Sequence, residues 1–286
     1  MNKNVVIFQA HTMDWFSRRA LRKLATELKG YADVFIQGLA GEERAFPEAS
    51  HGLPCTKYSR DGLLALPYPE KTRPAEWKLV PGNTDLMLLS LWREHPDYDY
   101  YWIVEYDVRY TGNWRRFLQK FDWCHADVLG TNVLRYRDTP DWNHWRSLVV
   151  PRDVDCVTEP IRAFLPLCRM SAAACAAVDA AYRAGWGGHN EVVWPTVACH
   201  DGLIVEDIGG EGPFTPEPRR GKFYTSTPKA LSLTPGSFGY RPMRPFGSPV
   251  PGRLSHPVKP RECWWDAIAR VKAVRNRFRR LPLIRS

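Results

Sequence analysis

The run of residues 100–105 constrains the fold of this chain most strongly. It reads Tyr-Tyr-Trp-Ile-Val-Glu, which is aromatic, β-branched and unbroken by any turn-forming residue. Such a run is typical of a central strand that is covered on both faces. Glu105 and Asp107 stand at and just after its end. Because ligands bind at the carboxyl ends of the strands in an open α/β sheet, these two carboxylates are the first candidates for a functional site.

A strand, a helix and a second strand are predicted near the start of the chain. Val5–Phe8 is a short apolar run, and Asp33–Gln37 is a second one. Between them a helix is expected over Trp15–Leu28, with Thr12 or Asp14 as its N-terminal cap. This order and spacing are typical of a βαβ unit, and therefore of a parallel sheet.

Helices and strands continue to alternate along the chain. Residues 39–82 and 209–260 are rich in Pro and Gly and are predicted to be mostly loop. The remaining pattern predicts helices over 85–94, 113–121, 172–184 and 191–199, and strands over 127–133, 162–170 and 203–207. The expected fold class is α/β, with a mostly parallel central sheet flanked by helices.

Composition excludes several classes of protein. The seven cysteines are odd in number and form no CxxC pair, which argues against a disulfide framework and against a zinc ribbon. The apolar run near the N-terminus is too short for a signal peptide, and no stretch reaches the roughly 18 apolar residues of a membrane span. We therefore expect a cytoplasmic protein.

The positive charge is concentrated near the C-terminus. Residues 261–286 hold eight Lys and Arg against two acidic residues, which accounts for +6 of the net charge of +9. The remainder is close to neutral, so nucleic acid is not an expected partner. The tail is predicted to form a basic amphipathic helix. Its apolar face would dock on an anionic membrane surface or pack on the domain, and RNA binding is a weaker third interpretation.

The spacing of Glu105 and Asp107 suits a metal site. Two carboxylates at i and i+2 of an extended segment point the same way, and their oxygens are ligands that Mn²⁺ or Mg²⁺ accepts. Such a cation would neutralise a departing diphosphate. The alternative is an acidic strand end that merely meets solvent.

The run from Tyr100 to Trp114 resembles the central block of an uncharacterised glycosyltransferase-like family. The shared pattern is an aromatic strand, then E-x-D-V-R, then G-x-W, a variant of the D-x-D motif of GT-A glycosyltransferases. The resemblance implies a GT-A-like, Rossmann-related catalytic domain over residues 1–260. The basic helix that the charge pattern predicts over residues 261–286 follows this domain. The resemblance makes Asp107 the main metal ligand and lets Glu105 contact the metal or the nucleotide-sugar.

A second segment, residues 186–196, resembles the same family through its G-H-x-E and P-T elements. The resemblance implies that Glu191, with His189 beside it, faces the acceptor hydroxyl, where an inverting enzyme needs a general base. The structural alternative is a helix that Asn190 caps, with Glu191 stabilised near the positive end of the helix dipole.

Two weaker matches complete the predicted site. The late H-P-V-K run resembles a block of the same family, which implies His256 as a third metal ligand and Lys259 as a contact of the diphosphate. The first strand resembles the nucleotide-contacting strand of that family, which implies that His11 and Thr12 lie at the nucleotide. Asp85 begins the helix just before the acidic strand, and the resemblance implies that this helix borders the nucleotide.

The resemblance implies a metal-dependent glycosyltransferase that moves a sugar from a nucleotide-sugar donor to a glycan or lipid-linked acceptor. It would act in polysaccharide or glycolipid biosynthesis, in the cytoplasm or peripherally on the inner face of the membrane. Two alternatives remain open. A nucleotidyltransferase acting on a sugar phosphate usually carries a glycine-rich phosphate loop, which residues 8–20 lack. A non-catalytic GT-A-like scaffold would keep the fold and use the basic tail for binding.

Overall fold

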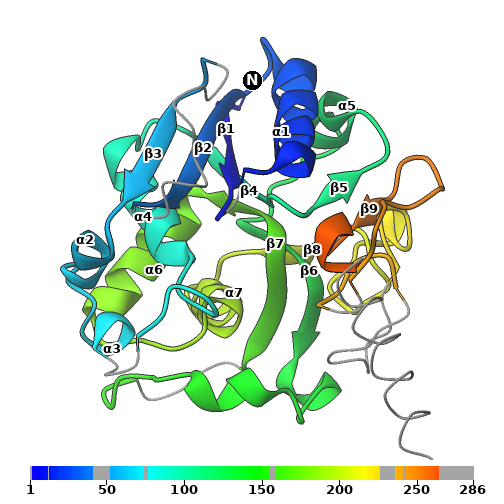
Figure 1. The fold of residues 1–286 in the computed structure, drawn as a ribbon. Helices are drawn as coiled ribbons and strands as arrows, with labels where there is room; N and C mark the ends of the chain where they lie inside the picture. The colour runs from blue at the N-terminus through cyan, green and yellow to red at the C-terminus, as the bar shows by residue number, and fades with distance from the viewer. Residues whose placement is uncertain are drawn as a thin grey trace, which may run out of the picture.

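A central mixed sheet organises the protein (Figure 1). The computed structural model describes residues 2–11, 13–40, 52–73, 77–154, 159–225, 236–240 and 243–263. Within these ranges seven strands are ordered β3-β2-β1-β4-β7-β6-β8, and β5 pairs with β9 in a second, two-stranded sheet. The strands are β1 (Asn4–Gln9), β2 (Asp33–Leu39), β3 (Cys55–Tyr58), β4 (Tyr100–Glu105), β5 (Arg109–Tyr110), β6 (Val128–Arg135), β7 (Ile161–Ser171), β8 (Val205–Asp207) and β9 (Leu254–Ser255).

Strand β7 is the exception to the parallel arrangement. It runs antiparallel to both β4 and β6, whereas the other neighbouring pairs of the seven-stranded sheet are parallel. The predicted α/β fold with a mostly parallel central sheet flanked by helices is therefore confirmed. The βαβ unit is also confirmed, because β1 and β2 pair in parallel with Val6 opposite Val34.

The helices begin close to the predicted positions because polar side chains cap them. Asp14 caps the first helix and accepts a hydrogen bond from the Ser17 amide at 2.9 Å. Ser171 does the same for Ala174 at 3.0 Å. The α-helices are α1 (Trp15–Leu28), α2 (Arg60–Leu64), α3 (Pro69–Thr72), α4 (Asp85–Glu94), α5 (Trp114–Gln119), α6 (Ala172–Arg183) and α7 (Asn190–His200); 3₁₀ turns are η1 (Tyr136–Asp138), η2 (Asn143–Ser147) and η3 (Glu217–Arg219).

Both faces of β4 are buried, as its sequence predicts. Tyr101 and Ile103 pack into a core shared with α4, α6 and α7. Trp102 and Val104 point to the opposite face and pack into a second core shared with α1 and α5. The alternation follows from the two-residue period of a strand. Because helices cover both faces, the open edge at the carboxyl ends of the strands is left for a site.

A buried lysine connects α3 with the start of α4 and with the loop that precedes α7. Lys71 on α3 is 2% exposed. Its Nζ donates to the Gly82 carbonyl at 2.6 Å and to the Gly188 carbonyl at 2.8 Å. It also lies 3.2 Å from a carboxylate oxygen of Asp85. Two hydrogen bonds and one ion pair therefore satisfy the ammonium group, and the start of α4 is held against the loop that precedes α7.

Replacing this lysine should destabilise the protein strongly. Lys71→Met would leave the Asp85 carboxylate buried without its cation, and we expect the free energy of unfolding to fall by about 3–5 kcal/mol. Urea unfolding followed by circular dichroism measures the change. Lys78→Met, at an exposed position, is the matched control and should change stability by less than ~0.5 kcal/mol. Equal stability of the two variants would contradict the structural role of Lys71.

The predicted C-terminal helix falls largely outside the described residues, which end at Cys263. The helix over residues 261–286 and its membrane role therefore stay predictions. None of the described helices has both the length and the apolar character needed to cross a bilayer.

Candidate metal centre and active-site cavity

The predicted acidic motif lies where the central strand ends. Glu105 is the last residue of β4, and residues 106–107 form a turn rather than an extended segment. The expectation that the two carboxylates converge through extended i, i+2 geometry is therefore wrong. The turn is held by the Tyr106 amide, which donates to the Gln9 carbonyl of β1 at 2.9 Å. The Asp107 side chain is almost fully buried, and Glu105 is partly exposed.

The late His256 segment is brought to this turn by long-range pairing. Arg109 of β5 pairs with Ser255 of β9, and the Val258 amide donates to the Asp107 carbonyl at 2.9 Å. As a result His256 Nε2 lies 3.4 Å from Asp107 Oδ1 and 3.8 Å from Glu105 Oε2. One ligand atom from each of the three residues can be chosen so that all lie within 4.8 Å of one another. The sequence prediction that these residues form one cluster is consistent with this geometry.

The contacts of His256 leave its Nε2 facing the acidic pair. Its Nδ1 lies 2.8 Å from the Gly239 carbonyl, so Nδ1 carries a proton, and Nε2 faces the carboxylates of Asp107 and Glu105. Asp107 Oδ1 is buried and has no hydrogen-bond partner. Facing acceptors repel unless a positive charge lies between them or the ring is protonated. An N–H···O=C bond at the far side of the ring is also the usual support of a metal-bound histidine.

The charges of the cluster are strongly coupled. Burial, with the Asp107 charge beside it, raises the pKa of Glu105 to about 7. Burial would also raise the pKa of Asp107, but His256 and Lys259 outweigh it and hold that pKa at about 2. Burial opposes the charged form of His256, yet the two carboxylates raise its pKa. One ionised carboxylate is thus fixed here, and it attracts cations.

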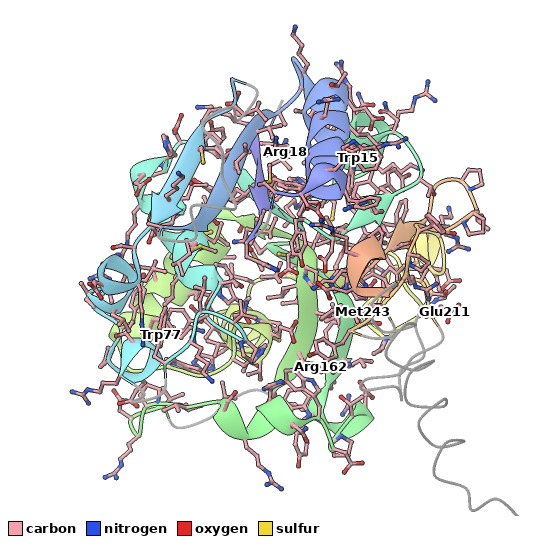
Figure 2. The ribbon with its side chains drawn as sticks, viewed as in Figure 1. Trp15, Arg18, Trp77, Arg162, Glu211 and Met243 are labelled. Carbon is pink, nitrogen blue, oxygen red and sulfur yellow. The ribbon has the colours of Figure 1, made fainter. Side chains whose placement is uncertain are left out.

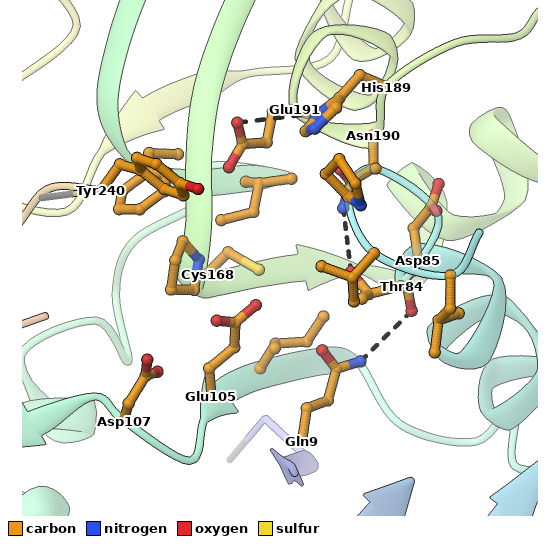
Figure 3. Close-up of a pocket in the computed structure, with 18 of the residues that line it drawn as sticks. Gln9, Thr84, Asp85, Glu105, Asp107, Cys168, His189, Asn190, Glu191 and Tyr240 are labelled. Atoms are coloured by element: carbon orange, nitrogen blue, oxygen red, sulfur yellow. Dashed lines mark hydrogen bonds and ion pairs between the residues drawn. The ribbon is translucent and has the colours of Figure 1, made fainter. Parts of the chain in front are cut away.

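A large cavity opens beside this cluster. Its volume is about 1250 Å³, and its walls come from the ends of β1 and β4, from β7, and from the start of α7. Figure 3 shows Glu105 and Glu191 pointing toward the same space from β4 and α7. The cavity therefore connects the metal-type cluster, which is Glu105, Asp107 and His256, with Glu191, the predicted general base.

Glu191 sits in the first turn of α7 and its side chain is only 17% exposed. Burial raises its pKa to about 7, although Arg162 and the Leu165 amide act in the opposite direction. A carboxylate with this pKa can hold or release a proton near neutral pH. The helix cap is His189, not Asn190: its Nδ1 accepts from the Glu191 amide at 3.3 Å.

His189 is placed to support the helix rather than to carry charge. Its ring stacks on His144 with centroids 4.1 Å apart. Burial, with His144 and Lys71 nearby, lowers the pKa of His189 to about 3, so the ring is neutral. A Cβ on Gly82 would lie 2.7 Å from this ring, which explains why glycine occupies that turn, where φ is +92°.

The remaining predicted residues are placed differently from one another. Lys259 Nζ lies 3.5 Å from Asp107 Oδ2 and beside the Tyr106 ring, at the mouth of the cluster. His11 is exposed at the cavity edge and meets the Tyr106 ring at 4.5 Å. Thr12 lies outside the described residues.

Asp85 lines the cavity, but its carboxylate is engaged elsewhere. It accepts from the Tyr182 hydroxyl at 2.5 Å and from Trp194 Nε1 at 2.9 Å, and it faces Lys71. It is 3% exposed. These contacts assign Asp85 to the buried support of α4 and α7, which the sequence prediction of a nucleotide contact did not anticipate.

Sequence reasoning missed two cavity residues. Gln9 at the end of β1 donates its amide N–H to Gln37 at 2.8 Å, and Arg162 reaches the cavity from β7. The position of Gln9 at a strand end was a usable signal. No sequence signal pointed to Arg162, because its importance depends on the atoms that surround it in the folded protein.

The fold and the cluster together define an α/β protein in which a Glu–Asp–His group that could hold a metal ion lies at the carboxyl end of β4. A family model described as a protein of unknown function (DUF3405) matches residues 51–127, a stretch that includes Glu105 and Asp107. No curated protein matches the chain. Among solved structures it is similar to the galactosyltransferase LgtC in complex with donor and acceptor sugar analogues, at 6% identity and a TM-score of 0.41, over 73% of this chain and 76% of that chain. A likeness this distant does not bear on activity.

Proposed function

We propose that this protein is a metal-dependent glycosyltransferase that transfers a sugar from a nucleotide-sugar donor to a glycan or lipid-linked acceptor. The observation that carries the proposal is the convergence of Glu105, Asp107 and His256 at the end of β4, where a buried oxygen of Asp107 accepts no hydrogen bond from the described residues. These residues fit a divalent cation held by two carboxylates and an imidazole. The mixed oxygen and nitrogen donor set suits Mn²⁺ better than Mg²⁺, which prefers an all-oxygen octahedron.

In this proposal each residue has a separate task. Asp107 and His256 hold the cation, which when bound neutralises the diphosphate of the leaving nucleotide. Lys259 adds a positive charge beside Asp107 for the same phosphates. Glu191 accepts the proton of the acceptor hydroxyl as its oxygen bonds to the anomeric carbon and the bond to the diphosphate breaks.

A donor screen tests the proposal. UDP-, GDP-, CMP- and dTDP-sugars are incubated with the protein and Mn²⁺, and donor hydrolysis is scored with and without EDTA. We expect hydrolysis of at least one donor, and its loss on chelation. Turnover that is indifferent to EDTA would contradict the metal role. Pyrophosphate release from a nucleoside triphosphate and a sugar phosphate would point instead to a nucleotidyltransferase.

The basic tail, residues 261–286, bears on where in the cell the proposed enzyme acts. Its charge is suited to an anionic membrane surface near a lipid-linked acceptor. Deleting residues 261–286 should then shift the protein from the membrane fraction to the soluble fraction at low salt while a soluble acceptor is still used. Unchanged fractionation would contradict the membrane role.

A further inference from the structure

One arginine of the cavity lacks the partners that the other buried arginines have. The Arg162 side chain makes no hydrogen bond and no ion pair with any described residue, and its Nε is buried. By contrast, Arg169 donates to three backbone carbonyls, of Phe121, Cys124 and Ala126. Arg109 also donates to backbone carbonyls. The buried Nε has no acceptor and the guanidinium faces the cavity, so we expect an anion bound there to complete its hydrogen bonds.

The surroundings of Arg162 favour an organic anion over a simple ion. The guanidinium lies over the Trp142 ring at 5.1 Å, and both line the cavity together with Phe164 and Tyr240. Aromatic walls with one fixed charged group are the usual lining of a small-molecule site. Glu191 is the carboxylate that acts on Arg162 electrostatically, but it forms no ion pair with it. The guanidinium therefore keeps its capacity for a bidentate acceptor.

The position of Arg162 along β7 separates it from the metal-type cluster. Val104 of β4 pairs with Leu167, so Glu105 lies level with Pro166 and Arg162 lies four residues beyond. At the rise of an extended strand this is about 13 Å. Figure 2 shows Arg162 near the end of β7 that lies away from β4. A group held there is not a ligand of a cation on Asp107, whose metal–oxygen bonds would be ~2 Å long.

Glu191 interacts electrostatically with groups at both ends of the cavity. These groups are Arg162 at one end and Glu105 and His256 of the cluster at the other. In the proposed reaction the donor diphosphate occupies the cluster end. The acceptor must then approach Glu191 from the Arg162 end.

We propose that Arg162 and Trp142 form a subsite for a negatively charged sugar, which bears a carboxylate or a phosphate, on the acceptor side of the cavity. Assigning this sugar to the acceptor rests on the proposed function, whereas the anion subsite itself does not. The planar guanidinium matches either oxyanion with two parallel hydrogen bonds, and the Trp142 ring beneath it holds the guanidinium in place.

Calorimetry without metal or nucleotide tests the subsite directly. The probes are glucuronate, glucose 6-phosphate, neutral glucose and inorganic phosphate. We expect one of the two charged sugars to bind at least ~10-fold more tightly than glucose, and Arg162→Gln to remove that difference. Arg146→Gln, at an exposed position on η2 outside the cavity, is the matched control and should bind like the wild type. A thermal unfolding curve confirms that each variant is folded.

The pattern of binding identifies or overturns the subsite. Preference for glucuronate indicates a sugar carboxylate, and preference for glucose 6-phosphate indicates a sugar phosphate. Equal binding of charged and neutral sugars, binding of inorganic phosphate alone, or no saturation up to ~10 mM overturns the proposal. So does an Arg162→Gln variant that keeps the preference.

The same titration with Asp107→Asn separates this inference from the proposed function. The subsite should keep its affinity in that variant, because Asp107 lies at the other end of the cavity. If the donor screen fails while the charged sugar still binds, the glycosyltransferase assignment falls and the anion subsite stands. The reverse result removes only the subsite.

Discussion

Asp107→Asn should lose metal-dependent nucleotide binding. In the wild type, UDP or another nucleoside diphosphate is expected to bind more tightly when Mn²⁺ is present. The amide keeps the size of the side chain but removes its charge, the only one in the cluster that the surrounding groups hold ionised well below neutral pH. We expect the Mn²⁺-dependent gain in affinity to fall by at least ~100-fold, because even residues that only support a ligand are worth 10–100-fold. Isothermal titration with and without Mn²⁺ measures it.

The control for this variant is Asp141→Asn, at an exposed position outside the cavity. It should bind nucleotide and metal like the wild type. The stability of Asp107→Asn is a second check. Removing a desolvated charge need not unfold the protein, so we expect the variant to stay folded. If Asp107→Asn binds Mn²⁺ and nucleotide with unchanged affinity, the cation does not sit on this turn.

Glu191→Gln should abolish most of the turnover while leaving donor binding intact. The amide cannot accept a proton, and loss of a general base typically costs 10²–10⁴-fold in kcat. In the wild type the ionised carboxylate is the active form. Because its pKa is about 7, the rate should rise as pH increases through 7. A pH–rate profile of the wild type that lacks this rise, or a variant with wild-type kcat, would rule out Glu191 as the base.

The same substitution makes a prediction that needs no substrate. Burial raises the pKa of Glu191 from its ordinary value of 4.5 to about 7, so the folded protein binds more protons than the unfolded chain between these values. The contribution of Glu191 to the free energy of unfolding is therefore fully present below pH 4.5 and is lost as pH rises through 7. The loss amounts to roughly 3 kcal/mol. Glu191→Gln should melt at a higher temperature than the wild type at pH 8 and close to it at pH 4.

Much of the fold could be predicted because its signals are local. The helices over Trp15–Leu28 and Asp85–Glu94 and the strand over Tyr100–Glu105 were predicted at their observed bounds. Periodicity, capping residues and glycine ends act within a few residues of one another. The reversed direction of β7 is different, because strand direction depends on which strand lies alongside and no residue within β7 specifies it.

The candidate site likewise has a part that local sequence signals predict and a part that depends on long-range contacts. The sequence by itself determined the apolar strand, its carboxyl end, and hence the placing of Glu105 and Asp107 at the edge where ligands bind. Only the tertiary structure decided that β5 and β9 pair and bring His256 to Asp107, and that Asp85 accepts hydrogen bonds from Tyr182 and Trp194. It also decided that the Arg162 side chain meets no hydrogen-bond acceptor among the described residues. Burial, charge and hydrogen-bond satisfaction depend on the atoms that surround a side chain, and most of those atoms belong to residues distant in the sequence.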